Sequence, residues 1–349
     1  MPSRVRPLVV RPGARYRCFG DGLCCTDVHL LGPLTRKEVV RLKVIDARSS
    51  KHDELLDAPV LRTRKNGACL FLDERGCSLH ADLGAHTKPA SCRRFPYRLV
   101  GTPHGGRVVT EHRCPCRTMG ARPRLDVADA EASLADDHGR LQADARVPDM
   151  LKKTKTTRIS FATYARLEAQ WLARILGNED VLDVLGGHRE LPELHSASWL
   201  DVAHLLRARI DGSACGDALA WFGDTLLELL SQREGARDDP RMPSKFRTRA
   251  RPWSEAFDRA EARSPNVDHP GAIIADFVAD ALWSLEWVGR TSLDGAFAEL
   301  SVRVIVARAI VDKLFREGAR ADRAAAEAVT IVELAGASGV WNSVVRELA

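Results

Sequence analysis

The placement of cysteines constrains this chain more than any other feature of its sequence. Eight of its nine cysteines fall between residues 18 and 116, partly in pairs, and only Cys215 lies outside that stretch. Thiols gathered in this way form disulfides, bind zinc or hold an iron–sulfur centre. We therefore expect the first third of the chain, which is rich in short loops, to fold around crosslinks or a metal.

Disulfides are the alternative that the sequence disfavours. They persist in oxidising compartments, and the basic start of the chain lacks the run of about 7–15 apolar residues that an export signal needs. Adjacent Cys24 and Cys25 also cannot bond to each other without strain. Since no stretch of about 18 apolar residues is present either, we expect a cytoplasmic protein that does not cross a membrane.

Metal binding explains the cysteines better, although their spacing does not choose the metal. Zinc would need four thiolate or imidazole ligands, and the chain offers one set in Cys69, Cys77, His80 and Cys92 and a second in Cys18, Cys24 or Cys25, Cys114 and Cys116. An iron–sulfur cluster takes thiolates from distant loops at irregular spacing, and a Pro after a ligand cysteine, as in 114–116, recurs in such centres. Both a [4Fe–4S] cluster and zinc therefore stay open at this point. The predicted ligands are Cys18, Cys24, Cys25, Cys69, Cys77, His80, Cys92, Cys114 and Cys116.

Charge is distributed unevenly along the chain. Residues 1–120 carry 22 Lys and Arg against 11 Asp and Glu, whereas the remainder carries 30 against 36. A basic segment raises the question of nucleic acid, but thiolates around a metal would add negative charge that the arginines offset. The aromatic residues of this segment mostly neighbour cysteines instead of forming a stacking surface, so we do not expect nucleic-acid binding.

Composition changes near residue 120, where alanine, leucine and helical spacing take over. This predicts an α+β protein that is mostly α: a loop-rich cysteine domain with short strands over 1–120, followed by an all-α helical domain over 121–349. Thr35 and Glu38 form a capping box that starts a helix at about residue 36, and residues 69–80 and 108–110 are predicted to contain strands. Apolar residues recur at helical spacing over 164–175, 199–210, 219–230, 273–285 and 302–314.

The cysteine-rich segment resembles a known family. Cys18-x5-Cys24-Cys25, Cys69 with Phe71-Leu72, Cys77-x2-His80, and Lys88-Pro89-x2-Cys92-Arg93-x-Phe95-Pro96-Tyr97 are similar to the CxxCxxCC cysteine-cluster family, which chelates zinc or iron. The resemblance covers about the first 120 residues and implies that Arg93 and Phe95 lie at the cofactor. The family's second cysteine falls on Asp21 here, so that position either ligates through oxygen or is not a ligand.

The same family includes flagellin lysine N-methylases, which share the layout of a cysteine-rich start and a helical remainder. The resemblance implies a [4Fe–4S] cluster, with zinc as the alternative. It also implies cluster-dependent methyl transfer from S-adenosylmethionine to a protein lysine. The helical half is only loosely similar, so three functions stay open: a metal-binding protein whose helical half receives a protein partner or substrate, a cluster-dependent protein-modifying enzyme, and a structural zinc adaptor. The arginines beside the cysteines either offset thiolate charge or pair with nearby carboxylates. Cys215 and five tryptophans are expected to lie in the helical core.

Overall fold

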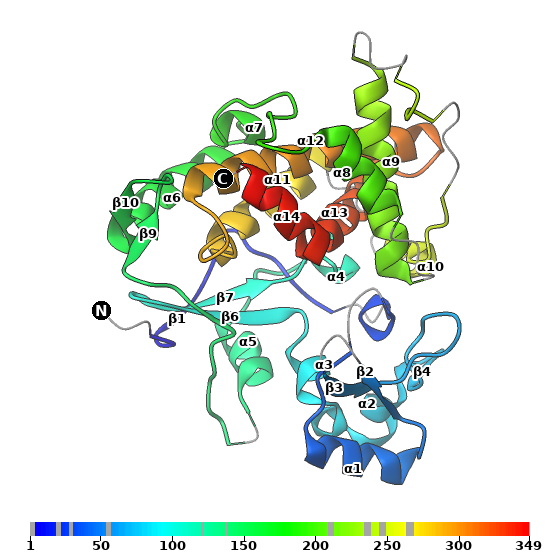
Figure 1. Ribbon diagram of the computed structural model, residues 1–349. Coiled ribbons are helices and arrows are strands. Elements are labelled where there is room, and N and C mark those ends of the chain that lie inside the picture. Colours follow the sequence, from blue (N-terminus) through cyan, green and yellow to red (C-terminus); the bar gives the residue numbers. More distant parts are fainter. Residues whose placement is uncertain are drawn as a thin grey trace.

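A computed structural model describes residues 4–18, 22–27, 31–53, 57–119, 122–136, 138–208, 213–233, 239–243, 249–262 and 269–348. The fold is α+β and mostly α, as the sequence predicted, with a small lobe and a sheet below a large helical part (Figure 1). Asp21 and Ile210, together with much of the proline-containing segment 237–252, lie outside the described residues.

A four-stranded sheet stands between the two parts, in the order β1 (Leu8–Val10), β7 (Gly105–Thr110), β6 (Tyr97–Thr102) and β8 (Ala145–Arg146). Strands β6 and β7 form an antiparallel hairpin in which Thr102 pairs with Gly105, while β1 and β8 add to its two edges in parallel. The fourth strand therefore comes from beyond residue 120. The domain boundary expected there stays a prediction.

Both faces of this sheet are covered, because alternate residues of a strand point to opposite sides. Leu99 and Val108 join one apolar cluster with helix α5 (Val127–Leu134). Val100 and Val109 join the large core of the helical part instead. The expected strand at 108–110 is confirmed as the end of β7.

The helical part is built around α13 (Ala321–Ala337), which is buried along most of its length. The helices expected from periodicity are confirmed, and shorter elements fill the connections. These helices are α6 (Phe161–Leu176), α7 (Val181–Val184), α8 (Trp199–Arg207), α9 (Ala214–Ser231), α10 (Ser254–Ala262), α11 (Pro270–Ser284), α12 (Leu293–Arg316) and α14 (Gly339–Leu348), and β9 (Met150–Lys152) pairs with β10 (Arg158–Ser160). Within the described chain no single helix is long and apolar enough to cross a bilayer; α13 and α14 meet that criterion only as a pair, bent by 82°.

The small lobe has its own apolar core, formed by Leu31, Leu34, Leu42, Leu61, Phe71 and Leu79. Its first helix begins at residue 36 with the expected capping box, and residues 69–80 contain the two expected strands, although they are short and His80 already belongs to a helix. The elements are η1 (Leu23–Cys25), α1 (Arg36–Ile45), β2 (Ser50–Asp53), β3 (Ala58–Leu61), β4 (Leu72–Asp73), β5 (Gly76–Cys77), α2 (Ser78–Leu83), η2 (Ala85–Thr87), α3 (Ala90–Arg94) and, beside the sheet, α4 (Pro115–Thr118).

Buried ion pairs join the sheet to α11. Arg11 Nε donates to Asp280 Oδ1 at 2.5 Å, and Arg117, fully buried, pairs with both Asp276 and Asp280. His112 lies in the same network, with Nε2 2.9 Å from Asp280 Oδ2. The Arg117 guanidinium therefore pairs with carboxylates of the helical part.

Candidate functional site

The largest cavity whose lining we describe has a volume of about 660 Å³ and lies where the small lobe meets the sheet. Five of the predicted metal ligands line it together: Cys24, Cys25, Cys69, Cys77 and Cys92. Phe71, Phe95 and Tyr97 add aromatic surface, and Lys88 contributes a cation. The two ligand sets suggested for zinc therefore do not match the cavity. Cys24 and Cys25 line it with Cys69, Cys77 and Cys92 instead of lying with the second set.

Short elements from four parts of the chain bring these thiols together. Cys24 and Cys25 end the 3-10 turn η1, and the Cys69 amide donates to the Cys25 carbonyl at 2.6 Å. Cys77 pairs with Leu72 across the β4–β5 ladder and is also the N-cap residue of α2. Cys92 lies in α3. Local turns, rather than one contiguous motif, determine where each sulfur lies.

The sulfur atom of Cys25 contacts the sulfur atoms of both Cys24 and Cys77. Cys24 Sγ lies 4.0 Å from Cys25 Sγ. A hydrogen bond from the Cys25 thiol lowers the pKa of Cys77 to about 6, against the effect of burial, with help from the backbone amides of His80 and Leu79 and from the Lys88 charge. Hydrogen bonds with Cys24 and Cys77, together with burial, raise the pKa of Cys25 far above its usual range. This arrangement favours a thiolate at Cys77 and a neutral thiol at Cys25.

The other two cavity cysteines are held as neutral thiols when no cation binds them. Burial raises the pKa of Cys69 to about 11, although the Phe71 amide opposes the shift, and burial raises the pKa of Cys92 to about 12 against the charge of Lys88. Burial acts to lower the pKa of Lys88, but the nearby thiolate charges, led by Cys24 and Cys77, raise it overall. A multivalent cation would reverse the balance for the thiols.

The donor set fits a thiolate-bound metal in its chemistry. Within the described residues no trio of His, Cys, Asp or Glu side chains is already arranged around one point as a metal site. The cavity nevertheless gathers five sulfur donors, and Cys69 and Cys77 each receive a backbone amide from the residue two positions on. Such amides stabilise metal-bound sulfur. The residues that would hold the group are Cys24, Cys25, Cys69, Cys77 and Cys92.

The remaining predicted cysteines form a separate group. Cys114 and Cys116 are buried at α4, and Cys18 is exposed. Burial, followed by charges at Cys114, Cys18 and Cys116, raises the pKa of Tyr16 well above its usual range. The Tyr16 ring meets the Tyr97 ring edge-on with 5.3 Å between centres, and Tyr97 in turn lines the cavity. The cavity lining therefore does not include these three predicted ligands.

Two further predicted site residues also lie outside the cavity lining. The His80 side chain is exposed, and its backbone amide rather than its imidazole acts on Cys77. Arg93 is half-buried, with Nη1 3.5 Å from the His86 carbonyl oxygen. Phe95, by contrast, lines the cavity; its expected contact with a cofactor stays a prediction.

Sequence reasoning missed the polar end of the cavity. Arg94 donates to Asp144 Oδ2 at 2.7 Å, and the same oxygen accepts the Leu99 amide at 2.8 Å. Arg98 and Arg113 approach Glu111 from either side, and Gln142 completes this end. Gln142 and Asp144 arrive with β8, whose pairing no sequence signal indicated.

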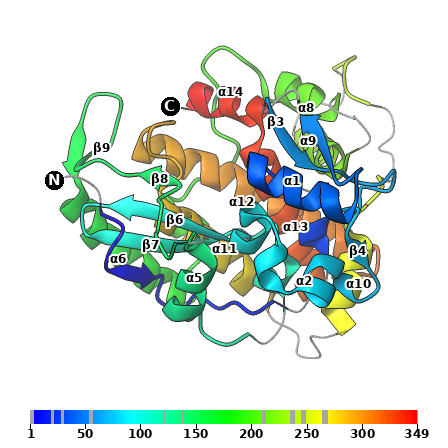
Figure 2. The same ribbon diagram turned by 90° about the horizontal axis from the view of Figure 1, so that it is seen from below.

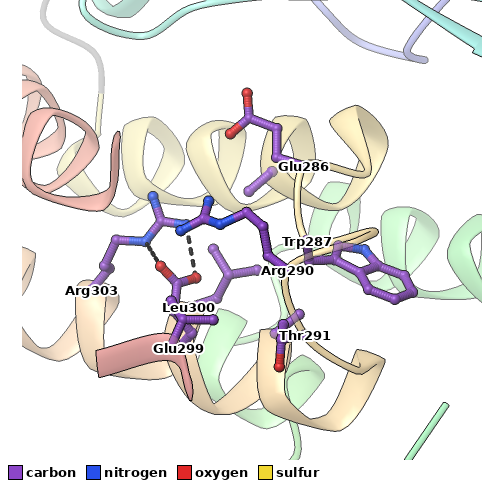
Figure 3. A pocket seen from close by; sticks show the side chains of 10 residues that line it. Glu286, Trp287, Arg290, Thr291, Glu299, Leu300 and Arg303 are labelled. Atoms are coloured by element: carbon purple, nitrogen blue, oxygen red, sulfur yellow. Dashed lines mark hydrogen bonds and ion pairs between the residues drawn. The ribbon is translucent and has the colours of Figure 1, made fainter. Parts of the chain in front are cut away.

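A second, much smaller pocket of about 20 Å³ lies in the helical part, and side chains close it (Figure 3). Arg303 pairs with Glu299 at 2.8 Å, Trp341 Nε1 donates to Glu299 at 2.6 Å, and Arg290 reaches the Gly336 carbonyl oxygen at 3.4 Å. Glu286 points away from that pair toward the sheet side. This pocket holds a buried ion pair and leaves the thiol-lined cavity as the candidate site.

Comparisons with known proteins found no match: no family model, no curated protein and no solved structure is similar to this chain.

Proposed function

We propose that the protein binds an iron–sulfur cluster in the thiol-lined cavity, with a zinc site as the alternative. The observation that carries this proposal is that five cysteines from four separate segments line one cavity beside Lys88. Cys69 is buried and the other four thiols are half-buried. Metal ligation gives them a shared purpose.

Charge supports a cluster at this position. A cluster held by four thiolates is anionic, and nearby cations and amide groups stabilise it and set its potential. Lys88 supplies the cation within the cavity, and the amides at Phe71 and Leu79 supply hydrogen-bond donors to sulfur. A cluster and a zinc ion would each use four of the five thiols.

Cavity size also favours a group larger than one ion. Its volume of about 660 Å³ corresponds to roughly 20 water molecules at about 30 Å³ each. A single zinc ion would leave most of that space to solvent. The cavity is within the usual range for sites that bind small organic ligands.

The second candidate function is an enzyme, which the polar end of the cavity favours. Arg94, Arg98 and Arg113 alternate there with Glu111 and Asp144. Such side chains can orient a charged co-substrate beside the metal, and the resemblance to flagellin lysine N-methylases names S-adenosylmethionine and a protein lysine. Methyl transfer to a candidate protein in the presence of S-adenosylmethionine would test this function. A cytoplasmic location remains part of the proposal.

Metal analysis of oxygen-free protein tests the primary proposal. We expect a brown protein that contains iron and acid-labile sulfide, and we expect Cys92→Ser to lose both. Cys215→Ser, which changes a half-buried thiol in α9, is the matched control and should keep the parent content. Stoichiometric zinc without sulfide would support the zinc adaptor. Equal metal content in Cys92→Ser and the parent would reject the cavity as the site.

A further inference from the structure

Helix α1 exposes an apolar stripe on the outside of the small lobe. Val40 is 61% exposed and Val44 is 84% exposed. They are four residues apart in a helix, so they lie on one face together with Lys37. Leu42 and Glu38 occupy the opposite face and are buried. Figure 1 shows α1 at the lower edge of the molecule, and Figure 2, seen from below, shows no other described element in front of it.

Positive charge frames this stripe. The helix contains Arg36, Lys37, Arg41 and Lys43, and its one acidic residue is Glu38. The Glu38 carboxylate is turned inward, where it accepts the Thr35 amide at 2.7 Å and the Ala90 amide at 2.7 Å. The outward face of α1 therefore combines two valines with cations and carries no carboxylate of its own.

The inner face of α1 is connected to the thiol-lined cavity. Pro33 and Thr35, directly before the helix, line that cavity. Glu38 receives the amide of Ala90, the first residue of α3, which carries Cys92 two residues later. A molecule bound on the outer face of α1 would thus lie across this helix from one wall of the candidate site.

We propose that the outer face of α1 docks a protein segment that is acidic and carries apolar side chains at helical spacing. Carboxylates would meet the exposed cations Arg36, Lys37 and Lys43, and apolar side chains would cover Val40 and Val44. Arg41 is half-buried, with Nη1 3.5 Å from the His86 carbonyl oxygen. The helix is about 15 Å long at 1.5 Å per residue, which suits a small, transient interface. The stripe has no exposed aromatic or leucine side chain of the kind that anchors helices in bilayers.

This inference deepens the proposed function, because it names the chemistry of the protein partner and the place where it binds. The inference rests on the proposed function in one respect only: the purpose of docking is to deliver a partner to the cavity. Binding on α1 itself requires no metal, so the two proposals can fail separately.

Fluorescence anisotropy with synthetic peptides tests the docking surface. The probe is a labelled 21-residue peptide with Glu and Leu at helical spacing, and the matched peptides replace Glu with Lys or Leu with Ser. We expect the parent protein to bind the Glu/Leu peptide, and the binding to weaken with added salt. Val40→Ser/Val44→Ser and, separately, Lys37→Glu/Lys43→Glu should each weaken it about tenfold or more.

Leu205→Ser provides the control, because Leu205 is 46% exposed on α8, outside the small lobe. It should bind as the parent does. Equal binding by the Val40→Ser/Val44→Ser variant, or equal binding of the Lys/Leu peptide, would overturn the proposal. So would vesicles of phosphatidylglycerol that bind the parent through α1 in place of the peptide, or a parent dimer in sedimentation that the valine variant lacks.

Each measurement is made on protein as purified and on protein stripped of metal. If the purified protein contains neither iron nor zinc but both forms bind the peptide, the metal proposal is rejected and the docking surface is kept. Metal retention without α1-dependent binding would do the reverse. Circular dichroism of each variant confirms that these exposed substitutions leave the helix content unchanged.

Discussion

Cys25 and Cys77 are the same residue type and touch each other, yet their environments give them opposite protonation. Cys77 accepts the thiol proton of Cys25 and the amides at the start of α2, and its pKa falls to about 6. Cys25 is hydrogen-bonded to Cys24 and Cys77 and shielded from solvent, so its pKa is raised. Position within a turn, rather than residue type, therefore decides which sulfur is ready to bind a cation or react.

This difference predicts the order of alkylation inside the cavity of the metal-free protein. At pH 7 Cys77 is mostly a thiolate, whereas Cys69, with a pKa of about 11, and Cys92, with a pKa of about 12, remain protonated. Iodoacetamide should therefore modify Cys77 before those two, and the Cys77 rate should rise as pH passes through about 6. Peptide mass spectrometry of a time course measures the order. Earlier labelling of Cys92 at pH 7 would contradict it.

The residue types in the sequence indicated a candidate site, but their spacing did not predict which side chains line the cavity. Five of the nine predicted ligands line one cavity, whereas Cys18, His80, Cys114 and Cys116 do not belong to its lining. His80 followed the spacing rule for a ligand, yet α2 turns its side chain to solvent and presents its amide instead. Asp144 could not be found from the sequence, since it reaches the cavity only through the pairing of β8 with β6.

At the scale of elements, Glu38 shows how one side chain serves two helices. One carboxylate oxygen accepts the Thr35 amide and completes the capping box of α1, and the other accepts the Ala90 amide at the start of α3. Both amides are N-terminal donors that an isolated helix leaves unpaired. The sequence predicted the first bond through the Thr35–Glu38 spacing, while the second joins residues 52 positions apart and carried no local signal.

Glu38→Ala should therefore destabilise more than a helix cap alone. We expect the free energy of unfolding to fall by about 1–2 kcal/mol, because the cap and a buried hydrogen bond to Ala90 are both lost. Urea unfolding measures the change. Lys43→Ala, on the exposed side of the same helix, should change it by less than about 0.5 kcal/mol. A loss no larger than that of Lys43→Ala would show that Glu38 does not link the helices.

Helical periodicity predicted the elements of the large part well, because each helix buries one apolar face in a shared core. The strands were harder. Strands β4 and β5 are two residues each, and β8 is set by its neighbour rather than by its own composition. Short strands of this kind depend on tertiary contacts, so a single sequence carries little information about them.

At the scale of the whole molecule, ion pairs hold the sheet against α11. Burial acts to raise the pKa of Asp276, but Arg117 and Arg11 lower it to about 2, and Arg11 and Arg117 likewise hold the pKa of Asp280 well below its usual range despite burial. A folded-state pKa below the unfolded value means that these carboxylates stabilise the protein at neutral pH. That stabilisation is lost as pH falls from about 4 to about 2.

Asp280→Asn should lower the free energy of unfolding at pH 7 by about 3 kcal/mol, because it leaves Arg11 and Arg117 buried with less compensating charge. The stability difference between the variant and the parent should shrink as pH falls below about 4. The Asp280 carboxylate of the unfolded parent then takes up a proton, while the folded parent keeps the charge. Urea unfolding followed by tryptophan fluorescence at several pH values checks this. Asp258→Asn removes an exposed partner of Arg323 and should cost less than about 1 kcal/mol at any pH.

The parallel pairing of β8 with β6 bears on how this molecule can be dissected. A fragment that stops at residue 120 would contain every clustered cysteine but would lack both β8 and α5. The β6 edge of its sheet would then have unpaired amides and carbonyls that can pair with another polypeptide chain. The apolar side chains of Leu99 and Val108 would also lose their contacts with α5. Truncation beyond residue 152 instead keeps that border closed and preserves the carboxylate that meets Arg94.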